Sequence, residues 1–63
     1  MDQKTAESGL GKRVRIILTN NFHYSGILLD CDKTSLTIRD KFSNKVTLTF
    51  QSIMLFEVTT NGD

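Results

Sequence analysis

The chain has 63 residues, of which 38% are apolar, and a formal net charge of +1. This length predicts one small domain with a thin core, a size that is marginally stable alone and therefore favours oligomerisation. It disfavours an enzyme, because so short a chain rarely encloses a deep pocket. The single cysteine, Cys31, excludes an internal disulfide, and Cys31 with His23 is too small a ligand set for structural zinc. We therefore expect neither a cofactor nor a metal.

The hydropathy and the charge distribution of the sequence limit the kinds of partner that we expect for this protein. The sequence holds no apolar run long enough to cross a membrane and does not open like a secretory signal, so we expect an intracellular, reducing, cytoplasmic protein without membrane contact. Residues 12–45 hold seven Lys and Arg against three Asp, whereas the flanking segments hold one Lys against four acidic residues. A basic centre suits a polyanionic partner, and a plain solvated charged surface is the alternative reading.

In chain order, residues 1–11 are polar and predict a short helix or a frayed arm, capped by Asp2 or Thr5. Period-two alternation then predicts a domain over residues 12–58, with strands at 13–19, 22–32, 36–38, 46–50 and 53–58. Asn20-Asn21 predicts a tight turn. Gly26, inside the second strand, indicates a bend or a close backbone approach. Residues 59–63 are expected to form a disordered tail.

Five short strands, tight turns and the absence of proline predict an all-β fold, a small, strongly bent five-stranded antiparallel barrel. Residues 27–29 and 53–56 are apolar on both faces of their strands, whereas one core buries only one face of a strand. Either the N-terminal arm covers the second face or a neighbouring subunit does. The polarity of the arm favours the neighbour.

Residues 16–28, with the sequence IILTNNFHYSGIL, resemble the first motif of Sm-like proteins, the family of Sm, Lsm and Hfq proteins. The matching positions are Leu18, Asn20, Tyr24, Gly26, Leu28 and Asp32, and the resemblance extends over residues 11–58. The second motif departs from the family: Gln51-Ser52-Ile53 replaces its Ile-Arg-Gly-like element, and Lys33-Thr34-Ser35 replaces the usual Met-Asn after Asp. The resemblance implies an SH3-like barrel of the Sm-like fold.

The resemblance also implies an assembly and a ligand. It implies a homo-oligomeric ring, a hexamer or heptamer, joined through the fourth and fifth strands, with an interface at Val46, Leu48, Met54, Leu55 and Phe56. It implies that single-stranded U- or A-rich RNA binds at two loops that hold Lys33, Thr34, Ser35, Phe50 and Gln51. In that site the lysine neutralises phosphate, Gln51 or Ser35 contacts a base edge, and Phe50 stacks. The alternation of the fourth strand instead predicts Phe50 in the core.

Three functions remain open from the sequence. The first is an RNA-binding ring that acts in RNA processing, stability or annealing. The second is the same barrel as a protein-interaction scaffold without RNA binding. The third, a small oligosaccharide- or nucleotide-processing enzyme, has no support from catalytic residues, because His23 and the pair Asp30 and Asp32 lack suitable companions. Arg13 and Arg15 share one strand face, where they either hold RNA or remain solvated, and Phe22 with His23 offers a secondary stacking surface.

Overall fold

The structure, a computed structural model, describes residues 1–59, and within them the chain is mostly β. Its elements are α1 (Gln3–Glu7), β1 (Arg13–Leu18), β2 (His23–Cys31), β3 (Ser35–Arg39), β4 (Lys45–Thr49), a 3-10 turn (Phe50–Ser52) and β5 (Ile53–Val58). The five strands predicted from alternation are confirmed to within one residue at each end. Most of the expected disordered tail, residues 60–63, lies outside the described residues.

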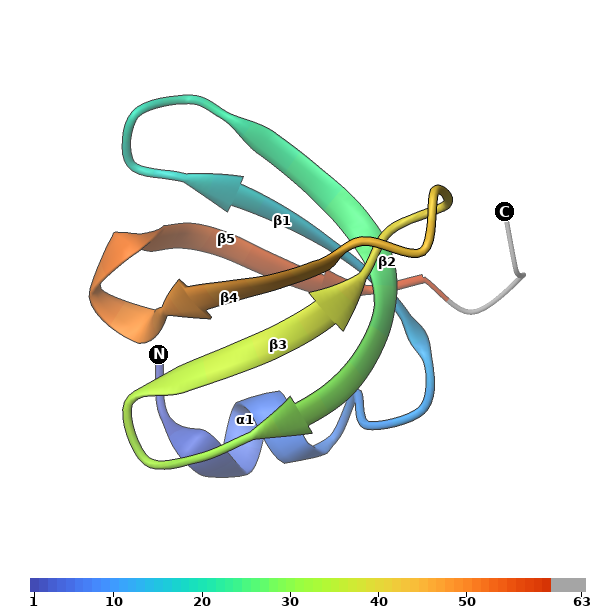
Figure 1. Ribbon diagram of the computed structural model, residues 1–63. Coiled ribbons are helices and arrows are strands. Elements are labelled where there is room, and N and C mark those ends of the chain that lie inside the picture. The colour runs from blue at the N-terminus through green and yellow to red at the C-terminus, as the bar shows by residue number, and fades with distance from the viewer. Residues whose placement is uncertain (60–63) are drawn as a thin grey trace.

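The strands form one antiparallel sheet in the order β4-β3-β2-β1-β5, which Figure 1 shows as a strongly curved layer with α1 at one end. The register shifts in β2 between Leu28 and Asp30 and in β1 between Ile17 and Leu18. Such irregularities increase the local bend of a strand. β4 and β5 are the two edges, and no pairing between them closes the sheet within the described residues. The structure therefore shows a bent five-stranded sheet rather than a closed barrel.

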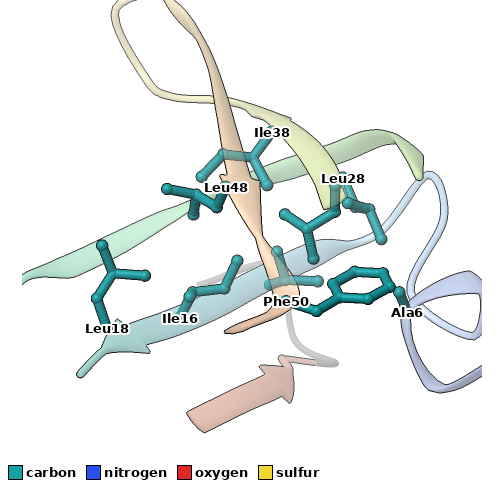
Figure 2. Packing of buried hydrophobic residues seen from close by; sticks show 9 residues of the cluster. Ala6, Ile16, Leu18, Leu28, Ile38, Leu48 and Phe50 are labelled. Atoms are coloured by element: carbon teal, nitrogen blue, oxygen red, sulfur yellow. The ribbon is translucent and has the colours of Figure 1, made fainter. Parts of the chain in front are cut away.

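The core lies inside the curved sheet and follows directly from the alternation of the strands. Its buried side chains are Ala6, Val14, Ile16, Leu18, Leu28, Leu36, Ile38, Leu48 and Phe50, most of which Figure 2 labels. Each fully buried aliphatic side chain contributes about 1.5–3 kcal/mol relative to an exposed one. Tyr24 is only half-buried and packs against the margin of this core.

Helix α1 covers one end of this core with a single side chain. Asp2, one of the two predicted caps, caps helix α1. Its Oδ1 accepts a hydrogen bond of 2.8 Å from the Thr5 backbone N–H. That hydrogen bond lowers the pKa of the Asp2 carboxyl below its ordinary value. Ala6 is fully buried, and Figure 2 shows the Phe50 ring directed toward it. In the rest of the arm Gly9 is buried too and most other residues are exposed, so the arm leaves Leu29, Met54 and Leu55 exposed.

Two non-glycine residues in turns adopt the left-handed backbone conformation, Asn21 (φ 69°) and Ser43 (φ 67°). The Asn20-Asn21 turn was predicted from the tolerance of asparagine for this region. The Asn20 side chain supports it by accepting a hydrogen bond of 3.0 Å from the Phe22 N–H. Thr59, the first residue of the expected tail, is also anchored, because its N–H donates to the Arg13 carbonyl at 2.9 Å.

Gly26 lies where β2 passes close to the end of β3. A Cβ at this position would overlap the Arg39 carbonyl group and approach the Asp40 Cα. The residue is buried, and its φ does not require glycine, so the need is steric. Only a residue without a side chain permits this approach of two backbones. Residues 1–59 contain no helix with the length and apolarity needed to cross a membrane.

Candidate functional site

The turn between β2 and β3 and the 3-10 turn before β5 lie side by side. The Phe50 N–H donates a hydrogen bond of 2.8 Å to the Thr34 carbonyl, and Ser35 pairs with Thr49 across β3 and β4. Beside these contacts lies an open cavity of about 330 Å³, which is lined by Met1, Lys33, Thr34, Thr49, Phe50 and Gln51. We call this cavity the loop pocket. It brings together four of the five residues assigned to the RNA site from the sequence.

Asp32 shapes one wall of the loop pocket. Its Oδ1 accepts hydrogen bonds of 2.8 Å from the backbone N–H groups of both Thr34 and Ser35. These two bonds lower the pKa of the Asp32 carboxyl below its ordinary value of 3.8, because they stabilise the charged form. The Asp32 N–H also donates to the Ser35 carbonyl at 2.8 Å, which closes the turn. The turn therefore holds Lys33 at its tip with a fixed backbone.

Lys33 and Gln51 supply the polar chemistry of the loop pocket. Both are exposed, one from each turn, and within residues 1–59 Lys33 has no acidic group at ion-pair distance. A lysine ammonium is a compact cation that suits a phosphate, and a glutamine amide both donates to and accepts from a base edge. The side chains of Met1 and Phe50 make the remaining wall apolar. The pocket can thus hold a flat, partly apolar group beside an anion.

Two residues assigned to the RNA site lie differently from the expectation. Phe50 is only 7% exposed and belongs to the core, so it offers the loop pocket an edge rather than a free stacking face. Ser35 does not line the cavity, and its hydroxyl donates to Asp32 Oδ1 at 3.2 Å. Ser35 therefore helps to hold the turn, and its contact with a base edge stays a prediction.

The five residues expected at a subunit interface divide into two groups. Leu48 is buried in the core, because the alternation of β4 directs it inward, and Val46 and Phe56 pack against the core from partly buried positions. Met54 and Leu55, on the edge strand β5, are exposed, Met54 by 60%. On β2, the other strand that is apolar on both faces, Leu29 is exposed as well. The side chains that an interface could bury are therefore Met54 and Leu55.

Asp30 and Cys31, at the end of β2, lie outside the lining of the loop pocket. Asp30 Oδ1 accepts a hydrogen bond from the Cys31 N–H at 2.8 Å, and desolvation raises the pKa of the Cys31 thiol, which disfavours the nucleophilic thiolate. No three His, Cys, Asp or Glu side chains gather as metal ligands in the described part of the chain.

Sequence reasoning missed two residues of the loop pocket, Met1 and Thr49. Thr49 follows from the hairpin register, since it lies directly opposite Ser35, whereas no local pattern places Met1 there. Compared with models of protein families, with curated proteins and with solved structures, the chain gives no match. The function is therefore argued from the geometry of the site.

Proposed function

We propose that the chain is a ring-forming, Sm-like protein that binds single-stranded RNA in the loop pocket. The observation that carries this proposal is the hydrogen bond from the Phe50 N–H to the Thr34 carbonyl, which joins the two turns that form the site in the family it resembles. Through this bond Lys33 and Gln51 face one cavity from separate turns. A base would enter against Met1 and the edge of Phe50, with its phosphate at Lys33.

The bare edges of the sheet support the ring. β4 and β5 each have a free row of backbone N–H and C=O groups, and such edges pair readily with another chain. Pairing β4 of one subunit with β5 of the next would bury Met54 and Leu55 and continue the sheet, as a hexamer or heptamer. The bent sheet would then be one unit of a Sm-like barrel assembly. A ring also multiplies a weak contact, since stacking contributes about 1–3 kcal/mol per base.

The test is a titration of labelled oligo-uridine and oligo-adenine at several salt concentrations, with the wild type, Lys33→Ala and Gln51→Ala. Lys33→Ala should reduce the salt slope by about 0.7 for each phosphate that the variant no longer neutralises. Gln51→Ala should leave the slope unchanged and alter the preference between the bases, because it removes a hydrogen bond worth about 0.5–1.5 kcal/mol.

Lys12→Ala is the matched control, since Lys12 is exposed and lines neither the loop pocket nor the cavity that includes Arg13 and Arg39. Mass in solution, measured on the same samples, should exceed that of the 7.1 kDa monomer several-fold in every variant. A monomeric wild type would contradict the ring. Equal binding by the wild type, Lys33→Ala and Gln51→Ala would remove the loop pocket as the RNA site.

Exposed apolar side chains on β5 also favour the second candidate, a protein-interaction scaffold. The two candidates differ in one observable. A scaffold would form a multimer or bind a peptide through Met54 and Leu55 without retaining oligo-uridine at any salt concentration.

A further inference from the structure

A second cavity lies at the opposite end of β3 from the loop pocket. It has a volume of about 400 Å³ and is lined by Arg13, Ile27, Arg39, Asp40, Lys41 and Ser43, with Gly26 at its base. We call it the basic groove. Ser35 begins β3 beside the loop pocket and Arg39 ends it at the basic groove. The two cavities are therefore separated by about 13 Å, the length of four residues in a strand.

The shape of the basic groove depends on Gly26. Because this residue has no side chain, the backbone of β2 approaches Arg39 and Asp40 more closely than any Cβ would allow. The loop after β3 is then fixed by Asp40, whose Oδ1 accepts hydrogen bonds of 2.9 Å from the N–H groups of Phe42 and Asn44. The positions of the cationic side chains are thus set by backbone contacts at the base of the groove.

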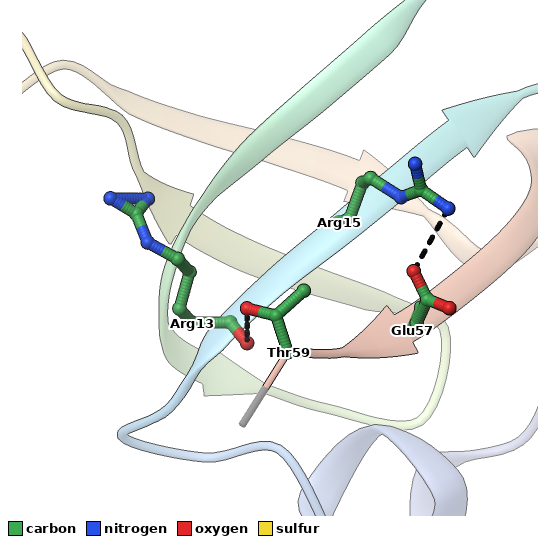
Figure 3. A network of polar contacts seen from close by, with 4 residues as sticks. All are labelled: Arg13, Arg15, Glu57 and Thr59. Carbon is green, nitrogen blue, oxygen red and sulfur yellow. Dashed lines mark hydrogen bonds and ion pairs between the residues drawn. The ribbon is translucent and has the colours of Figure 1, made fainter. Parts of the chain in front are cut away.

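Within the described chain, the cationic side chains of the basic groove form no ion pair. Arg13, Arg39 and Lys41 have no acidic partner at ion-pair distance among residues 1–59, and Asp40 is engaged by its own turn. Arg15, two residues from Arg13 on the same strand face, provides the contrast: its Nη2 lies 2.9 Å from Glu57 Oε1. In Figure 3 the Arg15 side chain reaches Glu57, whereas the Arg13 guanidinium is directed away from it.

These cations form a row across the sheet. Lys45 lies directly opposite Arg39, Arg39 opposite Ile27, and Ile27 opposite Arg13, so the row crosses four neighbouring strands. Directly opposite residues in an antiparallel sheet project from the same face. The row therefore presents three cations on one face, and Lys41 adds a fourth from the adjacent loop.

An exposed aromatic ring lies next to Lys41 in the loop that follows β3, although it does not itself line the groove. Phe42 is 73% exposed, and the Lys41 Nζ lies 5.4 Å from the centre of its ring. A ring this exposed gains nothing from the core, so its position is unexplained by folding. A cationic groove with a neighbouring aromatic platform is the combination that binds single-stranded nucleic acid, since phosphates meet the cations and a base stacks on the ring.

We infer that the basic groove and Phe42 form a second binding site for single-stranded nucleic acid, separate from the loop pocket. Arg13, Arg39 and Lys45 bind successive phosphates, and Phe42 stacks one base. This inference does not depend on the ring or on the loop pocket, because all of its residues belong to one chain and none lines that cavity. An acidic peptide or a free polyphosphate would satisfy the cations but leave Phe42 unused.

The first measurement is the salt dependence of oligo-uridine binding by Arg13→Ala and Arg39→Ala. Each variant should reduce the salt slope by about 0.7, which corresponds to about fivefold weaker binding at about 0.1 M salt. Arg15→Ala is the matched control, because it removes the same charge from the same strand face but from a pair with Glu57. It should change the affinity far less than Arg13→Ala.

The second measurement uses Phe42→Trp, which introduces the only tryptophan of the chain. Its fluorescence should be quenched by oligo-uridine, because the base stacks on the indole, and should remain unchanged with inorganic pyrophosphate. Phe42→Ala should weaken RNA binding several-fold at an unchanged salt slope. All of these positions are exposed or half-buried, and an unaltered melting temperature will show that the fold is intact.

Both measurements are repeated in the Lys33→Ala/Gln51→Ala background, which separates the two sites. If the loop pocket is wrong and the basic groove right, the background changes nothing and the groove variants still weaken binding. Equal losses in Arg13→Ala and Arg15→Ala would overturn the inference, since binding would follow net charge alone. Unquenched Phe42→Trp fluorescence, or displacement of RNA by pyrophosphate or oligo-glutamate at equal charge concentration, would also overturn it.

Discussion

The two ends of strand β3 carry cavities of similar size and opposite character. The loop pocket has one cation, Lys33, and an apolar wall that includes Phe50, a residue of the core. The basic groove has three cations, and no side chain of the buried core lines it. The same strands support both cavities, so the difference comes from the turns. One turn brings the apolar Phe50 to its cavity, and the other concentrates positive charge.

The two cavities depend on the folding of the domain in different ways. The loop pocket shares Phe50 with the core, so its shape and the stability of the domain change together. The basic groove is shaped by a backbone approach at Gly26, while its charged side chains lie at the surface. Substitution of those side chains should therefore alter binding without altering stability.

The largest expected effect is at the loop pocket. Phe50→Ala should lower the free energy of unfolding by about 3–5 kcal/mol, because it leaves a cavity in the core. A domain of this length has a total stability of about 3–9 kcal/mol, so much of the variant should be unfolded at room temperature. Chemical denaturation measures this loss.

Phe50→Leu is the milder variant. Because it keeps an apolar side chain, it should lower the free energy of unfolding by less than Phe50→Ala does. If Phe50→Ala melts like the wild type, Phe50 is not part of the core and the stability of the domain does not depend on the loop pocket.

At the other end, Gly26→Val should lower the free energy of unfolding by about 1–3 kcal/mol, because its side chain meets the Arg39 carbonyl. Gly11→Ala is the control for backbone strain alone. Gly11 has a φ of 77° with open space around it, so its substitution should cost about 1–2 kcal/mol without moving the basic groove. Amide chemical-shift changes in Gly26→Val should concentrate at residues 39–44. An even spread of these changes over the sheet would contradict the local contact.

The smallest expected effect concerns pH and reaches the loop pocket through Asp32. Since the pKa of Asp32 is lowered by folding, its contribution to stability is present above the ordinary value of 3.8 and is lost as the pH falls through the folded value. Asp32→Asn should therefore show a weaker loss of stability than the wild type between neutral pH and pH values below 3.8. Asp2→Asn is the comparison, because the pKa of Asp2 is also lowered by a hydrogen bond, in this case at the cap of helix α1. Identical acid profiles for wild type and Asp32→Asn would remove the turn hydrogen bonds as the cause.

Much of the fold was predictable because its signals are local. The alternation of Val14, Ile16 and Leu18 identifies both a strand and its buried face, and the same holds for Leu36 and Ile38. The turn at Asn20-Asn21 and the helix cap at Asp2 depend only on residues that are near them in the sequence. Both could therefore be predicted from the sequence as well. The Asp32 turn belongs to this class.

The parts that were not predictable depend on long-range register. Gly26 was expected to mark a bend or close approach, but its partners Arg39 and Asp40 are identified only by the pairing of β2 with β3. The basic groove unites Arg13 with Lys41 for the same reason. Phe42 carries no strand or helix signal, so its exposure next to a cationic row emerges only in three dimensions.

The two free edges of the sheet would also determine how large an assembly of these chains becomes. These edges belong to different strands, β4 and β5, so a contact between them is head-to-tail and leaves one free edge of each kind on every product. Such a contact has no natural end point unless the rotation between neighbours returns the last subunit to the first. The angle set by the curvature of β2 would then decide between a closed assembly of defined size and an open filament of any length. A substitution that flattens this strand would convert one form into the other without touching the interface.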